Sequence, residues 1–172
     1  IQKHRNFMAS FLDFVAQYSG SPVIFLPHCI ESGRGNDVQI SKDICHRMNS
    51  KARVIEDDLS ARELKALIKN ANFLIAERTH SMIGAVSVAT PFIGLTSSID
   101  IRTHEIVGEM SSCEEQLYDL DCANIDDLKL LFVREYDGRF RQIEKLKVVT
   151  TAHKERLKLM ADLIICAVYE NS

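Results

Sequence analysis

At 172 residues, the chain has the length of one good-sized domain and is short for two. Apolar residues make up 46% of the sequence and charged residues 26%, with a net charge of −3, as is usual in globular proteins. This near-balance argues against a nucleic-acid-binding surface, because domains that follow phosphate backbones usually carry a clear basic excess.

No apolar run approaches the ~20 residues needed to span a bilayer, and no signal-like segment opens the chain, so we expect a cytoplasmic protein without a transmembrane segment. The chain begins at Ile1 within helix-like sequence, so we expect a fragment of a longer protein. The cysteines are odd in number and lack C-x-x-C spacing, which favours reduced thiols over a disulfide framework: Cys29, Cys45, Cys113, Cys122 and Cys166.

The first predicted elements are a helix and a buried strand. Phe7, Phe11 and Val15 recur at a spacing of four, which indicates an amphipathic helix, and a Gly-Ser-Pro run ends it. The strand covers 23–26, and His28 follows its C-terminal end.

A polar loop covers 31–37, in which Gly33 and Gly35 flank Arg34. Glycine permits close approach of the backbone to a ligand, so Arg34 is placed to meet an anion, although a solvated arginine explains the pattern equally well. A helix is predicted over 38–49.

A second short strand is predicted over 53–55, followed by an acidic turn. Ser60 and Glu63 have the spacing of a capping box, which predicts the start of a helix that continues through Ile68.

The central stretch alternates between apolar and polar segments. Buried strands are predicted over 73–76 and 91–95, with a helix rich in small residues over 82–89 between them. The polar segment 77–81 lies where the first strand gives way to the helix, and open α/β folds bind ligands at such places.

The remaining chain continues the pattern. A polar strand exit covers 96–105, an edge strand is predicted over 116–120, and a helix begins at Asn124. A long helix is predicted from about 139 to 169, long enough to pack on a neighbouring domain as well as its own.

Alternating strands and helices predict a single α/β domain over 1–172, a Rossmann-like three-layer sandwich with a parallel sheet of about five strands. In a parallel sheet the carboxyl ends of the strands share one edge, so we expect three strand exits to face one pocket. Their candidate substrate-binding residues are His28, Arg34, Arg78, His80, Ser81, Thr96 and Ser97.

Arg78 and His80 are the strongest candidates for chemistry. A guanidinium two positions from an imidazole, before a helix N-terminus, suits a phosphate or carboxylate. Imidazole can also exchange a proton near neutral pH. The alternatives are an ion pair of Arg78 with Glu77 or Asp57 and a helix-capping role for His80. The histidines lack metal-ligand spacing, and no cofactor motif is present, so we expect neither a metal nor a cofactor.

Several of these segments resemble the C-terminal half of the polysaccharide pyruvyl transferases. The similar segments are V-I-F-L-P-H at 23–28, the loop ending at Asn36-Asp37, A-R-E-L-K-A-L-I-K-N-A-N-F-L-I-A at 61–76, and E-R-T-H-S-M-I-G-A-V-S-V-A-T-P-F-I-G-L at 77–95. The family has an R-x-H-[SA] element after the strand, and Arg78, His80 and Ser81 match it.

The resemblance implies a GT-B-like enzyme that moves a pyruvyl group from phosphoenolpyruvate onto sugar hydroxyls. The product would be a ketal on a surface polysaccharide or exopolysaccharide, made on a glycan or lipid-linked sugar acceptor. Arg78 would hold phosphoenolpyruvate and His80 would assist proton transfer. The family's N-terminal domain is missing, so we expect this fragment alone to be inactive.

One departure from the family concerns the segment after the closing strand. Many members have a tyrosine and a lysine there, whereas this chain has T-S-S-I-D-I-R at 96–102. The resemblance implies Arg102 as the substrate-binding stand-in for the lysine, although arginine and lysine are not interchangeable.

Two other functions fit the same alternation of strands and helices. One is a GT-B glycosyltransferase or epimerase domain that uses a nucleotide sugar, with Glu105 or Glu109 as donor-binding carboxylate. The other is a non-catalytic binding module that makes contacts through its long last helix.

Overall fold

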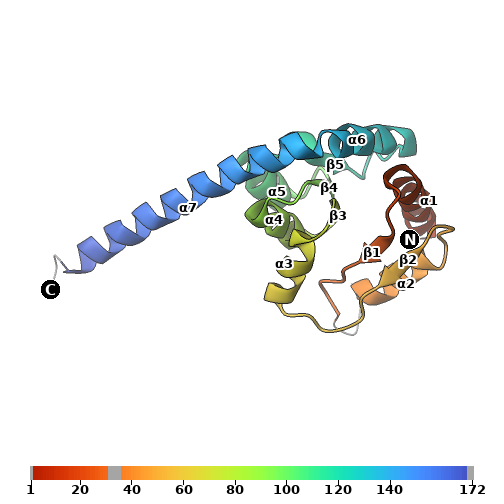
Figure 1. Cartoon of the computed structure of the whole chain (residues 1–172), viewed down its shortest axis with the longest axis horizontal. Helices are drawn as coiled ribbons and strands as arrows, with labels where there is room; N and C mark the ends of the chain where they lie inside the picture. Colours follow the sequence, from red (N-terminus) through yellow and green to blue (C-terminus); the bar gives the residue numbers. More distant parts are fainter. Residues whose placement is uncertain (1, 31–35, 170–172) are drawn as a thin grey trace.

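The computed structural model describes residues 2–30 and 36–169 and shows an α/β protein in which helices and strands alternate (Figure 1). The elements in chain order are α1 (Gln2–Ser19), β1 (Val23–Phe25), α2 (Asp37–Cys45), β2 (Ala52–Val54), α3 (Ala61–Lys69), β3 (Leu74–Ala76), α4 (Thr79–Val88), β4 (Phe92–Thr96), α5 (Ile101–Thr103), the π-helix η1 (His104–Glu109), the 3-10 helix η2 (Glu114–Gln116), β5 (Leu117–Asp119), α6 (Ile125–Asp137) and α7 (Arg139–Tyr169).

All strand pairings within the described residues are parallel, as predicted, but these strands form two small sheets rather than one sheet of five. β1 pairs with β2, and β4 lies between β3 and β5. Side-chain packing joins the two sheets, because Val23 and Phe25 of β1 contact the same core as Ile75 of β3 and Ile93 of β4. Four of the five strands in the described part of the chain are only three residues long, and hydrophobic contacts rather than a continuous backbone ladder join the two sheets.

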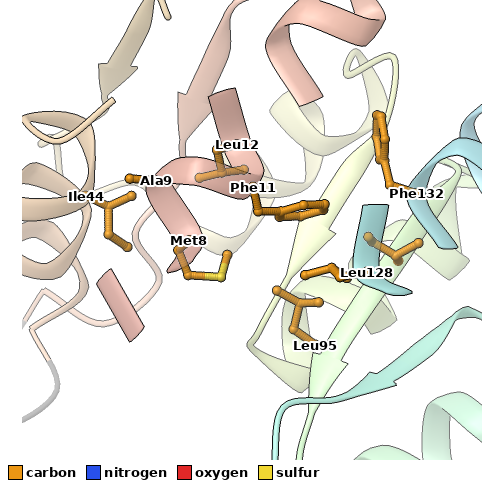
Figure 2. Close-up of a cluster of buried hydrophobic side chains, with 9 residues drawn as sticks. Met8, Ala9, Phe11, Leu12, Ile44, Leu95, Leu128 and Phe132 are labelled. Atoms are coloured by element: carbon orange, nitrogen blue, oxygen red, sulfur yellow. The ribbon is translucent and has the colours of Figure 1, made fainter. Parts of the chain in front are cut away.

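Helix α1 supplies the centre of this shared core. Figure 2 shows Met8 and Phe11 of α1 between Ile44 of α2 on one side and Leu95 and Phe132 on the other. The Phe132 ring packs edge-on against Phe11, with ring centroids 6.2 Å apart. This core fixes β1 and α2 against β4 and α6.

A second core lies under α4. Met82 and Ala85 of α4 are fully buried against Ile68 of α3, Phe92 of β4 and Leu146 of α7. Two fixed neighbours, β3 before it and the core beneath it, therefore set the position of the first turn of α4.

Helix α7 is 31 residues long and extends well beyond the rest of the molecule (Figure 1). Its first part is anchored by Gln142 and Leu146, which are buried. Its far part exposes apolar side chains, including Leu157, Met160 and Ile164. No helix among residues 2–30 and 36–169 has the length and apolar character that crossing a membrane requires.

Candidate functional site

The Arg78 guanidinium is held by Asp37, at the start of α2. Arg78 Nη2 lies 2.6 Å from Asp37 Oδ1, and Nε donates to Oδ2 at 3.3 Å. The ion pair that sequence analysis set against anion binding is therefore present, but its partner is Asp37 and not Glu77 or Asp57. The Glu77 carboxylate is directed to His4 instead, with Oε1 3.4 Å from His4 Nε2. The Arg78 side chain stays 50% exposed, so a ligand can still reach it.

Asp37 is fixed from the other side by the backbone. Its Oδ2 accepts hydrogen bonds from the amides of His28, at 3.1 Å, and Cys29, at 2.9 Å. Burial on its own would raise the pKa of Asp37, but the bonds from Arg78 and the two amides outweigh it, and the pKa is lowered. Asp37 is thus a carboxylate held in its ionised form beside the motif formed by Arg78, His80 and Ser81.

His28 contacts the motif directly. Its Nδ1 lies 3.0 Å from the Leu26 carbonyl oxygen and its Nε2 lies 3.1 Å from Ser81 Oγ. Because a carbonyl only accepts, Nδ1 carries the proton, and Nε2 of the neutral ring accepts from the Ser81 hydroxyl. His28 and Ser81, which were both predicted as site residues, therefore lie together, and Ser81 is buried.

His80 is exposed in the first turn of α4 and has no hydrogen-bond partner within the described part of the chain. Arg78 is the N-cap residue of α4 and makes no side-chain cap bond, so no side chain satisfies the first amides of this helix from that position. An exposed imidazole, a half-exposed guanidinium and a helix N-terminus thus occur within three residues. Helix N-termini attract anions.

Thr79 links the motif to the next strand exit. The Thr103 hydroxyl donates its one proton to Asp100 Oδ2, at 2.7 Å. In the 2.6 Å contact between the two threonines, the Thr79 hydroxyl is therefore the donor and Thr103 Oγ1 the acceptor. This chain of hydrogen bonds ties the first turn of α4 to α5. Sequence analysis did not single out Asp100 or Thr103.

The other predicted residues are less closely connected to Arg78. Thr96 is buried and Ser97 half-buried, and neither bonds to Arg78 or His80 among the described residues. Arg102 lies on α5 with an exposed side chain. Arg34 falls outside the described residues.

Two surface hollows, of about 600 and 310 Å³, lie away from Arg78 and His80, one beside Lys42 and Arg53 and the other beside Tyr136 and Arg139. Neither hollow is lined by Arg78, His80 or Ser81. We place the candidate site at these residues because the Arg78 guanidinium and the Asp37 carboxylate meet there. No set of three metal-ligating side chains comes together within residues 2–30 and 36–169.

A family model described as polysaccharide pyruvyl transferase matches residues 3–99. The chain belongs to this family. Comparison with curated proteins gave no match, and neither did comparison with solved structures. The region matched by the pyruvyl transferase model includes His28, Asp37, Arg78 and His80, and it ends before Arg102. The direct contacts around Arg78 therefore lie within the part that carries the family signature.

A further histidine of this pyruvyl transferase family member, His104, lies on the strand exit after β4. Its Nδ1 is 2.9 Å from Glu114 Oε1, and this bond raises the pKa of His104 above 6.5. The folded state therefore favours the protonated ring, and the bond contributes stability below pH 6.5 that is lost as pH rises through the raised pKa.

Replacing Glu114 with glutamine is expected to lower the pKa of His104 toward its ordinary value, because the carboxylate that stabilises the imidazolium is gone. An NMR titration of the histidine ring protons measures this change. Glu115→Gln is the control, since Glu115 is the adjacent exposed carboxylate and makes no described bond to His104. An unchanged pKa in Glu114→Gln would contradict the assignment.

Proposed function

We propose that this protein is a pyruvyl transferase that moves the pyruvyl group of phosphoenolpyruvate onto hydroxyls of a sugar. The product is a ketal on a surface polysaccharide or its precursor, and the acceptor is a glycan or lipid-linked sugar. Family membership supports the reaction class. The observation that carries the proposal is the half-exposed Arg78 guanidinium, held at the first turn of α4 beside His80.

The donor has two anionic groups, a carboxylate and a phosphate. Arg78 binds one of them, because a guanidinium forms charge-assisted hydrogen bonds to such oxygens, and the first amides of α4 add partial positive charge. Ser81, Thr96, Ser97, Arg34 and Arg102 are proposed as further substrate-binding residues, with His28 fixed against Ser81.

The proposed reaction begins when an acid protonates the methylene carbon of phosphoenolpyruvate. One acceptor hydroxyl then attacks the resulting cationic carbon and loses its proton. A second hydroxyl attacks the same carbon, passes its proton to a base and displaces phosphate, which leaves with the C–O bonding electrons. The result is a carbon with two C–O bonds to the sugar. His80 is the proposed proton donor or acceptor, since it is exposed and its imidazole can serve either role.

We propose a two-domain enzyme in which this chain forms a Rossmann-like, GT-B-like C-terminal domain, with the ligand in a cleft facing an N-terminal domain. Two large apolar side chains at this edge, Ile99 and Ile101, are 84% and 65% exposed, as expected for a surface that another domain covers.

Thermal unfolding in the presence of ligands tests the proposal. A saturating excess of phosphoenolpyruvate is expected to raise Tm by about 5–10 °C, from about 2.7 kcal/mol of binding at 100 times Kd. UDP- and GDP-sugars should leave Tm unchanged. Stabilisation by a nucleotide sugar alone would instead indicate a glycosyltransferase, and no response to any of these ligands would indicate a binding module.

A further inference from the structure

We propose that Asp37 is a positioning residue, whose carboxylate fixes the Arg78 guanidinium in the orientation that meets the anionic donor. The inference rests on the proposed function, because it assigns Asp37 a role in binding phosphoenolpyruvate at the same site. Asp37 does not touch the substrate in this scheme and acts through Arg78.

The pairing between the two side chains is side-on and uses both carboxylate oxygens. Nη2 binds Oδ1 and Nε binds Oδ2, so the plane of the guanidinium is set by two contacts rather than one. A guanidinium carries five N–H donors in a fixed plane, so fixing two of its three nitrogens fixes the direction of all five. Without Asp37, the half-exposed Arg78 guanidinium would lose both of these contacts and the orientation that they set.

Asp37 can position another group because it is itself rigid. Its side chain is only 17% exposed, and Oδ2 accepts two backbone amides of the β1 exit in addition to Arg78. The pair of Lys147 with Glu144 differs in this respect, because both side chains are mostly exposed and lie on one helix. Exposed pairs of that kind contribute little.

Asp13 offers a matched control for the structural part of this role. It is a buried carboxylate that accepts the backbone amides of Asn49 and Ser50, at 2.9 and 2.8 Å, but the described residues include no arginine bound to it. Asp13→Asn and Asp37→Asn both remove a carboxylate that holds a loop, so both should lower Tm. Only Asp37→Asn should change the orientation of the Arg78 guanidinium and, with it, the affinity for phosphoenolpyruvate.

The test measures Kd for phosphoenolpyruvate by calorimetry with the full chain. Asp37→Asn is expected to weaken binding roughly 10- to 100-fold, the range found when a group that orients a metal-binding side chain is removed. Asp13→Asn should keep the affinity of the unmodified protein. Equal affinity losses in the two variants would overturn the inference, because general destabilisation would then explain both.

A double-substitution cycle separates positioning from a direct effect. Lysine lacks the planar fork of arginine, so in an Arg78→Lys background the loss caused by Asp37→Asn is expected to fall to about threefold or less. A loss that stays the same in that background would overturn the inference while leaving the proposed function intact. If the unmodified protein bound no phosphoenolpyruvate, both would be overturned.

Discussion

Replacing Arg78 with alanine is expected to weaken the binding of phosphoenolpyruvate by at least about 100-fold, or about 2.7 kcal/mol. Two effects add in this variant. The donor loses its charge-assisted hydrogen bonds, and the Asp37 carboxylate, whose partner is removed, is left ionised beside the anion and repels it. Calorimetric titration of the variant and of the unmodified protein measures the difference.

Arg62→Ala is the matched control, because Arg62 is an exposed arginine on α3 and lies outside the site. It removes one positive charge from the chain without altering the Asp37 pairing. A similar loss of affinity in both variants would show that net charge and not the position of Arg78 governs binding. Full affinity in Arg78→Ala would contradict the assignment of the site.

Replacing Gln142 with leucine is expected to lower the free energy of unfolding by about 3–6 kcal/mol, the largest stability effect we anticipate. The Gln142 side chain acts as a strand partner for β4. Its Oε1 accepts the Phe92 amide at 2.6 Å, and its Nε2 donates to the Phe92 carbonyl at 3.0 Å. β5 pairs with β4 only from Gly94 onward, so leucine would leave both buried backbone groups of Phe92 without a partner. Urea denaturation measures the loss.

Gln116→Leu is the control for this prediction. Gln116 is also buried, and like Gln142 it donates to Glu135 Oε2, at 3.0 Å, but it binds no backbone group, and its Oε1 has no partner among the described residues. We expect a loss of only about 1 kcal/mol in this variant. Equal losses in the two variants would show that the shared bond to Glu135 is responsible.

Local sequence patterns predicted much of this structure. The capping box at Ser60 and Glu63 is confirmed, with the Ser60 amide 2.9 Å from Glu63 Oε2. The parallel pairing and the family are also confirmed. These features depend on neighbouring residues or on the alternation of strands and helices, which are visible in sequence.

The partner of Arg78 could not be predicted in the same way. Asp37 lies 41 residues from Arg78, and its position in the first turn of a helix already explains an acidic residue through the helix dipole. The local candidates, Glu77 and Asp57, are nearer in sequence. Which carboxylate reaches the guanidinium depends on how α1 packs β1 and α2 against the second sheet.

The division into two sheets has a mechanical consequence for the site. No backbone ladder among the described residues joins β1 to β3, yet the bonds from Asp37 to Arg78 and from His28 to Ser81 both span this boundary. Side-chain contacts yield more readily than ladders of backbone hydrogen bonds. Small rotations of one half of the molecule against the other would therefore change the width of the proposed anion site while both sheets stayed intact.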